Sequence, residues 1–407
     1  MELDGRGSPP LGQSSFTKRF WQLVDSVVDP AWRALLEMPW AIRATTLAAM
    51  TAGLVFWQIP GLWERMSSHL ISNPPISAQA GADRGFPDIA ATEALTSRID
   101  NMVRTEILQN PQDQTAWSLA QAMFSIMLAK KSIPSNMEAI NLKIKSTAHH
   151  ERFCWSEYDD EPEKPCALFI SGWIFGSIPE SNLSSYRNEI DRSLEFQTQS
   201  GAWPMFESTL SDRFLSTYTT AWMIVGLKAV RDARLDPALN DRIDPAIARA
   251  CVWLVKNRES SGRWKSFPDL PYSRVSLSIS GLVVHAISEG CPDQIEAVAD
   301  SWVDRLAQTT DFGDNDENGY IEIQTGLGKT NDHFVYFRIP WMMIATIDAA
   351  EHSNPDRRAK ATRFVGALLA RPEVQNADSD HRSWARAELL VALEYLAGNR
   401  KNLSPAS

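Results

Sequence analysis

The sequence predicts an all-α protein whose main domain is an α/α toroid of about six helical hairpins, preceded by one transmembrane helix and an amphipathic helix. Six mostly apolar segments with helical patterning recur at intervals of about 50 residues. A helical pattern that is apolar on one side only precedes nearly every one of them. The six segments are 114–128, 165–177, 216–230, 273–288, 334–350 and 382–396.

The N-terminal residues predict a membrane anchor. Within a cytoplasmic segment 1–43, residues 16–40 have the pattern of an amphipathic helix lying on the inner membrane surface. Residues 44–63 carry no charged side chain, and a helix of about 20 residues spans about 30 Å, the thickness of a bilayer core. A buried helix of a soluble protein is the alternative for this segment, because Gln58 and Pro60 interrupt it.

Basic side chains predict how the anchor is oriented. Five arginines and lysines precede the span, whereas only Arg65 and Arg84 follow it before the main domain. This bias places the N-terminus in the cytoplasm and the main domain in the periplasm or another extracytoplasmic space, anchored to the inner (plasma) membrane. The linker 64–87 leads to the toroid domain 88–396, and 397–407 form a flexible tail.

Two kinds of helix alternate in the main domain. In 355–371, Ala361, Val365 and Leu368 form one apolar stripe among charged residues, as in a helix with one face in water. The segments 219–230 and 341–347 are apolar on every side, as in a helix that is buried all round. This alternation predicts an outer and an inner ring of helices.

Cap residues predict where three of the outer helices begin. Asn354-Pro355 and Asp244-Pro245 each place a capping acceptor before a proline at the first helical position. Ser135, followed three residues later by Glu138, is typical of a capping box.

Composition limits the classes of partner. A net charge of −10 argues against nucleic acid, because phosphate binding requires a basic surface. Fifteen tryptophans suit a large helical core or an aromatic-lined cavity.

The four cysteines leave their pairing open. Cys154 and Cys166 bracket a charged loop and form either a disulfide or two free buried thiols. Cys251 and Cys291 lie in helical contexts, where we expect core residues.

A turn motif recurs between outer and inner helices. A glycine allows the outer helix to end, an aromatic ring packs across the hairpin, and an amide side chain caps a neighbouring helix. The motif residues are Gln197, Gly201 and Trp203 in one copy and Asn257, Gly262 and Trp264 in a second, with Trp155 and the pair Gly319-Tyr320 at the same place in two others.

With these turns the chain resembles the terpenoid cyclase and protein prenyltransferase superfamily, whose α/α toroids carry Gln-Gly-Trp turns. The resemblance covers about 88–396 and implies the toroid fold, which polysaccharide lyases and glycosidases also use. The string closest to the Asp-x-Asp-Asp motif of class II cyclases is 314–317, but it lies in the turn before the fifth inner helix. No cysteine follows an aspartate by two residues, as the prenyltransferase zinc site requires. We therefore do not expect either of these two activities.

The mouth of the inner ring, where helix N-termini converge, is the expected site. In a lyase-like reaction, His333 or Tyr336 acts as base while arginines neutralise an acidic sugar. Alternatively, Asp332 pairs with an acid from 157–161 as in glycoside hydrolysis. A structural ion network is the third interpretation, in which Asp332 or Glu388 neutralises the buried Arg338. The candidate residues are Tyr218, Arg274, Asp332, His333, Tyr336 and Arg338.

One further segment has the start of a calcium-binding loop. Asp314, Asp316 and Asn318 match its first ligand positions, although Thr325 stands where the loop requires a bidentate glutamate. The alternative is an acidic turn in solvent. Calcium is the only cofactor that the sequence suggests.

The sequence leaves two hypotheses for function. The first is an extracytoplasmic toroid that binds or processes an envelope ligand in its central cavity, either an anionic polysaccharide or an isoprenoid or other lipid-linked molecule. The second is a catalytically inactive toroid that serves as a docking or scaffold subunit of a membrane complex. An open cavity favours the first if it is lined by Tyr218, Arg274, Tyr336 and Arg338. A centre filled by Trp222, Met342 or Met343 favours the second.

Overall fold

The structure is a computed structural model, and all the residues that it describes lie in one compact unit, Asn73–Ser407. These residues are mostly helical, so the predicted all-α class is confirmed. None of the helices among them is long and apolar enough to cross a membrane. The predicted segments 1–43, 44–63 and 64–87 lie outside the described residues. The described ranges are 89–129, 133–157, 164–207, 215–270, 273, 275–306, 320–324, 333–377 and 382–403, with only the backbone described for 320–324 and 333–336.

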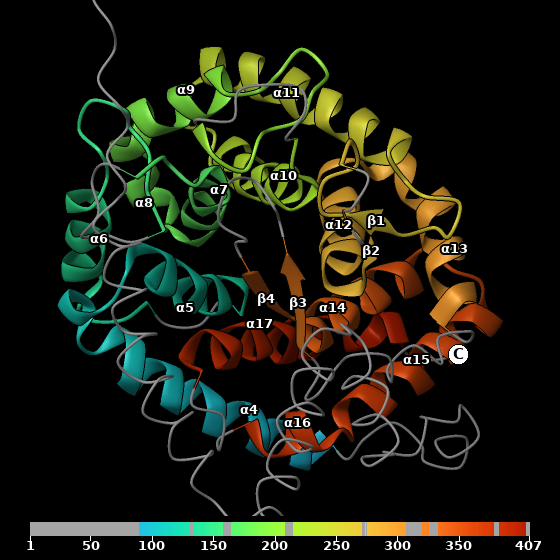
Figure 1. The fold of residues 1–407 in the computed structure, drawn as a ribbon. Coiled ribbons are helices and arrows are strands. Elements are labelled where there is room, and N and C mark those ends of the chain that lie inside the picture. The colour runs from blue at the N-terminus through green and yellow to red at the C-terminus, as the bar shows by residue number, and fades with distance from the viewer. Residues whose placement is uncertain are drawn as a thin grey trace, which may run out of the picture. The chain divides into compact units, whose positions relative to one another are not determined.

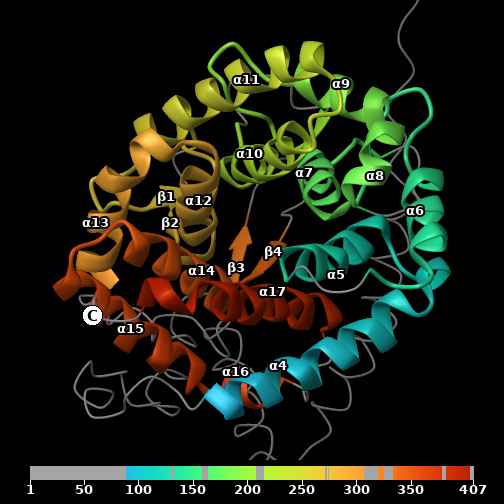
Figure 2. The same ribbon diagram turned by 180° about the vertical axis from the view of Figure 1, so that it is seen from behind.

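Each of the six predicted apolar segments contains a buried helix, and we call these six the inner helices. They contact one another in chain order, and the last of them contacts the first (Figures 1 and 2). The contacts therefore form a closed order. The inner helices are α5 (Ala116–Leu128), α7 (Leu168–Ser177), α10 (Thr217–Asp232), α12 (Leu277–Gly290), α14 (Arg338–Glu351) and α17 (Ser383–Asn399).

A second set of helices lies outside the inner ones (Figure 1). In α15, Ala361, Val365 and Leu368 are buried while the charged positions stay exposed or half-buried, which confirms the predicted stripe. The outer helices are α4 (Ile89–Val103), α6 (Met137–Ser146), α9 (Arg187–Glu195), α11 (Pro237–Lys256), α13 (Ile295–Leu306) and α15 (Pro355–Leu369). Shorter elements are the π-helix η1 (Arg104–Leu108), the helices α8 (Glu180–Leu183) and α16 (Pro372–Gln375), and the 3-10 turns Pro111–Asp113, Ser184–Tyr186, Pro292–Gln294 and Arg400–Leu403.

The described residues also include two short antiparallel strand pairs. Strand β1 (Trp264–Lys265) pairs with β2 (Val275–Ser276), and β3 (Tyr320–Gln324) pairs with β4 (His333–Phe337). The prediction that 334–350 is helical throughout is therefore wrong at its start. The aromatic and β-branched run 333–337 favours a strand. Proline is tolerated only in the first turn of a helix, and Pro340 lies in the first turn of α14 because this helix begins at Arg338.

The predicted start of α15 is confirmed, because the Asn354 side chain accepts a hydrogen bond from the Arg357 backbone N–H at 3.0 Å. The start predicted at Asp244-Pro245 is wrong. Helix α11 begins at Pro237, Asp236 caps it, and Pro245 lies inside the helix. The extra turns bury Leu239 and Ile243, and this burial offsets the hydrogen bond that Pro245 cannot donate.

The capping box predicted at Ser135 is also wrong. Asn136 occupies the N-cap of α6 and makes no capping hydrogen bond with its side chain. Its Nδ2 instead donates to the carbonyl oxygen of Leu108 at 2.7 Å, so a tertiary contact has replaced the local one.

The turn motif ties each hairpin together through an indole N–H. In three repeats, the indole nitrogen donates to a backbone carbonyl two residues before the end of the preceding outer helix, where carbonyls lack helical partners. The pairs are Trp155 with Ile144 at 2.8 Å, Trp203 with Ser193 at 2.7 Å, and Trp264 with Leu254 at 2.7 Å. Gly201 and Gly262 have φ values of +99° and +77°, as predicted for permissive positions.

Glycines allow two pairs of inner helices to approach closely. A Cβ atom on Gly172 of α7 would lie 2.6 Å from the backbone carbonyl carbon and oxygen of Trp222 in α10. A Cβ atom on Gly281 of α12 would lie 2.5 Å from the carbonyl oxygen of Trp341 in α14. Any larger residue at either position would force the two backbones apart.

The C-terminal inner helix also closes against the first outer helix. Helix α17 contacts both α5 and α4. Arg386 of α17 forms an ion pair with Glu106 in η1, and Arg400 lies 3.4 Å from Glu93 of α4. Residues about 300 positions apart in the sequence are therefore neighbours.

All four cysteines form disulfides. The Cys154–Cys166 bond settles the alternative left by the sequence. Cys251 and Cys291 are buried core residues, as expected, and a disulfide also joins them, with their Cα atoms 6.0 Å apart. Cys251 lies on the buried face of α11 and Cys291 caps the C-terminus of α12. The two helices form one of the predicted hairpins, but no local sequence pattern paired these two cysteines.

Candidate functional site

The inner helices run parallel, which defines a mouth at their N-terminal ends. Side chains in the first turns of neighbouring helices contact one another: the Trp117 ring lies 5.2 Å from Phe169, which lies 5.4 Å from Tyr218. Side chains from the last turns also meet, as in the contact between His285 and Tyr395 at 5.4 Å. The first turns of α5, α7 and α10 therefore lie together at one end of the inner helices, and the functional site expected there stays a prediction.

Below the mouth, aromatic rings fill the space between the inner helices. The rings of Trp173 and Trp222 stack with centroids 3.5 Å apart, and the Trp341 ring lies edge-on to Trp222 at 5.2 Å. Trp341 also lies 6.1 Å from Trp173, although α7 and α14 are three places apart in the closed order of six. Side chains from opposite helices thus meet at this level, with Met342 and Met343 buried behind them.

A carboxyl group lies between three inner helices near the mouth. Glu388, in the second turn of α17, accepts a hydrogen bond from Gln121 Nε2 of α5 at 3.2 Å and another from Trp341 Nε1 of α14 at 3.3 Å. Burial raises the pKa of Glu388 to about 8, although both hydrogen bonds favour the ionised form. At neutral pH the carboxyl group is therefore mostly protonated.

Tyr218, in the first turn of α10, is close enough to this carboxyl group for the two to interact electrostatically. Its hydroxyl oxygen accepts a hydrogen bond from Trp173 Nε1 at 3.4 Å. Burial raises the pKa of Tyr218 well above its usual value, and the negative charges of Glu388 and Glu157 raise it further. The phenol stays protonated, so it can donate a hydrogen bond to a partner.

The structure places some of the predicted site residues and leaves others open. Tyr218 and Arg338 are both 5% exposed, and each lies in the first turn of an inner helix. His333 and Tyr336 are on β4, which runs directly into α14. Seen from either side, the β3–β4 pair falls within the outline of the ring of inner helices, near its middle (Figures 1 and 2). The remaining predicted positions, Arg274, Asp332, Asp314, Asp316 and Asn318, lie outside the described residues.

Sequence reasoning considered Glu388 only as a partner for Arg338 and missed Gln121. The hydrogen bonds described for the Glu388 carboxyl come from Gln121 and Trp341. Both polar residues lie within mostly apolar inner segments, 114–128 and 382–396. A polar residue inside a fully buried helix must find a partner, and that was the signal available in the sequence.

A second buried polar group lies at the opposite end of the inner helices. Asp348 of α14 accepts hydrogen bonds from His285 Nδ1 at 2.9 Å and from the Tyr395 hydroxyl. Burial would lower the pKa of His285, but the adjacent Asp348 carboxyl raises it. These contacts join α12, α14 and α17, which indicates a structural role.

No protein-family model and no curated protein sequence matches this chain. The resemblance to the terpenoid cyclase and prenyltransferase superfamily therefore rests on the turn residues alone.

Proposed function

We propose that this protein is a membrane-anchored α/α toroid that binds an acidic polysaccharide of the cell envelope at the N-terminal mouth of its inner helices. The closed order of helix contacts supports the toroid. Two disulfides support an oxidising, extracytoplasmic location, in agreement with the basic residues that precede the predicted span.

The observation that carries the proposal is the protonated carboxyl of Glu388 beside Tyr218. Strongly shifted pKa values in buried groups are typical of functional sites. A neutral carboxyl and a phenol both donate and accept hydrogen bonds, which is the pattern that sugar hydroxyl groups require. Trp117 and Trp384, in the first turns of α5 and α17, are only partly buried and offer aromatic surface at the mouth.

Contacts among Trp173, Trp222 and Trp341 favour binding at the mouth over processing in a central cavity. Because these rings meet from opposite helices, they fill the centre. Among the described side chains, a ligand could reach only those sides of Glu388 and Tyr218 that do not contact Trp341 and Trp173. Arg338, in the first turn of α14, supplies positive charge near the mouth and favours an acidic ligand.

The same filled centre favours a second candidate, a catalytically inactive docking subunit of a membrane complex. The two functions differ in what the mouth recognises. The first requires affinity for a free polysaccharide, whereas the second requires a protein surface and predicts no such affinity.

Binding to purified full-length protein in detergent tests the first function. Alginate and polygalacturonate serve as acidic probes, dextran as the neutral probe and undecaprenyl phosphate as the isoprenoid probe. We expect one of the acidic polysaccharides to bind, and affinity to fall as pH rises through about 8, where Glu388 loses its proton.

Variants of Glu388 test whether this carboxyl contributes. Glu388→Ala removes the hydrogen-bonding group and should weaken binding about tenfold or more, while Glu388→Gln keeps a neutral donor and should bind without this pH dependence. Glu394→Gln is the matched control, because Glu394 is buried on the same helix two turns further on. Failure of every polysaccharide to bind a folded protein would refute this function and leave the docking subunit.

A further inference from the structure

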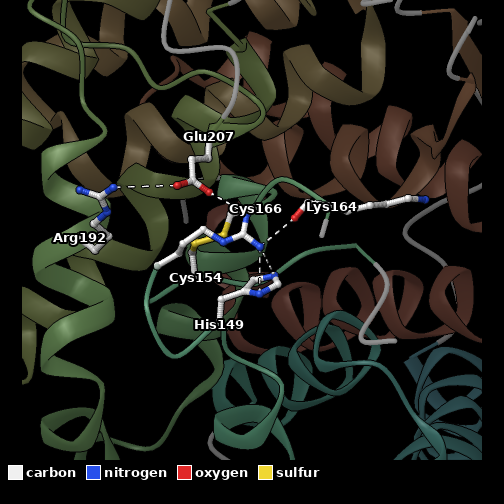
Figure 3. Close-up of a disulfide and its surroundings, with 7 residues drawn as sticks. His149, Cys154, Lys164, Cys166, Arg192 and Glu207 are labelled. Carbon is white, nitrogen blue, oxygen red and sulfur yellow. Dashed lines mark hydrogen bonds and ion pairs between the residues drawn. A yellow bond between two sulfur atoms is a disulfide. The ribbon is translucent and has the colours of Figure 1, made fainter. Parts of the chain in front are cut away.

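The first disulfide lies next to a carboxylate in a position suited to a metal ion. The sulfur atoms of Cys154 and Cys166 and a carboxylate oxygen of Glu207 all lie within 4.8 Å of one another (Figure 3). Zinc bound to two thiolates and a carboxylate has bonds of about 2.0–2.3 Å, which in tetrahedral geometry separates the ligand atoms by about 3.3–3.8 Å. Small side-chain movements would therefore bring these three atoms to zinc distance.

Backbone hydrogen bonds hold the three donors together independently of the bond between the sulfurs. The Glu207 N–H donates to the Cys166 carbonyl at 2.9 Å, and the Ala167 N–H donates to the Trp155 carbonyl at 2.8 Å. Each bond links the segment of one donor residue to the segment of another. The donor positions are therefore preorganised, and we expect them to persist when the disulfide is opened.

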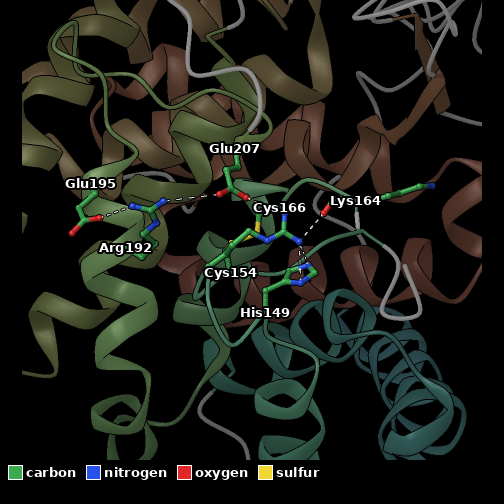
Figure 4. A network of polar contacts seen from close by, with 8 residues as sticks. His149, Cys154, Lys164, Cys166, Arg192, Glu195 and Glu207 are labelled. Atoms are coloured by element: carbon green, nitrogen blue, oxygen red, sulfur yellow. Dashed lines mark hydrogen bonds and ion pairs between the residues drawn. A yellow bond between two sulfur atoms is a disulfide. The ribbon is translucent and has the colours of Figure 1, made fainter. Parts of the chain in front are cut away.

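The surrounding charges suit a cation bound by thiolates. Arg152 donates to Glu207 at 3.3 Å, and its other terminal nitrogen lies 3.0 and 3.2 Å from the two ring nitrogens of His149. Figure 4 shows Arg192 reaching Glu207 from the other side, at 4.0 Å. Two thiolates and one carboxylate would carry three negative charges, which a zinc ion and the Arg152 guanidinium together balance.

His149 offers a fourth ligand next to this set of three donors. Its backbone N–H donates to the Cys154 carbonyl at 2.9 Å, which holds the residue beside the cysteines. An imidazole nitrogen is a common zinc ligand. The His149 ring lies against the same guanidinium that contacts Glu207.

We propose that the reduced form of this protein binds one zinc ion through Cys154, Cys166 and Glu207, with His149 in the fourth position. A dithiol reductant supplies two electrons and two protons, breaks the sulfur–sulfur bond and is itself oxidised to a disulfide. Zinc then displaces the two thiol protons into solvent. The same pocket thus holds a disulfide under oxidising conditions and a metal ion under reducing conditions. This inference does not depend on the proposed function of the mouth.

The second disulfide provides an internal control. Among the described residues, the group around Cys154 is the one set of three clustered metal-ligating side chains, and the Cys251–Cys291 pair has no such third donor. Serine substitutions at Cys251 and Cys291 should therefore leave zinc binding unchanged, whereas the same substitutions at Cys154 and Cys166 should abolish it.

The test uses the full chain in detergent, in one sample oxidised and in the other reduced with a phosphine. Each sample is equilibrated with zinc, and unbound metal is then removed. Elemental analysis should find about one zinc per reduced chain and none per oxidised chain, and Glu207→Gln should weaken binding at least tenfold. Cobalt substituted for zinc should give the thiolate charge-transfer absorption expected of a cysteine-ligated ion.

Three outcomes would overturn the inference. In the first, the reduced protein is folded but takes up no zinc. In the second, the variant that lacks Cys154 and Cys166 still takes up zinc. In the third, the cobalt-bound protein shows no thiolate charge-transfer absorption. If the double serine variant fails to fold, Glu207→Gln still decides, because this half-buried side chain lies at the edge of the core and its loss leaves both cysteines in place.

Discussion

Replacing Glu388 with glutamine should change how the stability of the protein depends on pH. Gln121 of α5 and Trp341 of α14 donate hydrogen bonds to the carboxyl, Tyr218 of α10 interacts with it electrostatically, and all three are neutral. With no cation among the causes of its pKa shift, burial raises the pKa of Glu388 to about 8. A glutamine there can accept from Trp341 and donate to a reoriented Gln121 amide.

The size of this change in stability follows from the difference in the pKa of Glu388 between the unfolded and the folded protein. The unfolded chain releases the Glu388 proton near the ordinary value of 4.5, whereas the folded chain keeps it up to about 8. A raised pKa stabilises the folded state fully at low pH, and this contribution is lost as pH rises between those two values. At about 1.4 kcal/mol per pH unit, wild type should lose roughly 4 kcal/mol between pH 5 and pH 8 that Glu388→Gln does not lose.

Urea denaturation followed by tryptophan fluorescence measures this difference. Free energies of unfolding at pH 5 and pH 8 are compared between wild type and Glu388→Gln, so that the contributions of all other titrating groups cancel. Glu394→Gln, on the same helix, controls for the loss of a carboxyl group in general. Equal pH dependence in wild type and Glu388→Gln would refute the argument that Glu388 is protonated in the folded protein.

Four further substitutions test the helix packing, the turn motif and a helix cap, with Gly398→Ala as the control. Gly172→Ala should destabilise by about 3 kcal/mol, because its Cβ would meet the α10 backbone, whereas Gly398→Ala, with nothing within 4 Å, should change stability by less than about 1 kcal/mol. Equal melting temperatures for the two variants would contradict the close helix approach. Trp203→Phe should cost about 2 kcal/mol in urea denaturation by leaving the Ser193 carbonyl without its indole donor. Asn354→Ala should lower the free energy of unfolding by about 1 kcal/mol, because it removes the N-cap hydrogen bond of α15. An unchanged free energy of unfolding would show that solvent replaces this hydrogen bond.

The sequence predicted those features that depend on local patterns. Apolar periodicity located all six inner helices, because a helix buried on every side needs apolar residues all round. The N-cap at Asn354 was predicted correctly because the side-chain acceptor and the backbone donor lie within four residues of each other. The positions of the permissive glycines Gly201 and Gly262 were predicted correctly because they too depend on local sequence.

Features that depend on distant contacts were missed or misread. Asp236 and Asp244 both precede a proline, and only burial of the intervening turns decides that α11 begins at the first. The Cys251–Cys291 bond joins residues 40 positions apart, which no local pattern connects. At the site, Tyr218 could be placed at a helix start, but its neighbour Glu388 is 170 residues away, and Gln121 comes from a third helix.

The contacts of α17 with α4 and α5 have a consequence for biosynthesis. The chain is made from its N-terminus, so α4 and α5 emerge first, yet the helix that covers them is nearly the last part to be synthesised. Until α17 arrives, the apolar side of α5 and the carboxylate of Glu106 have no partner from that helix. A nascent or truncated chain therefore exposes this apolar surface, and we expect its folding to require a chaperone that covers α5 until synthesis ends.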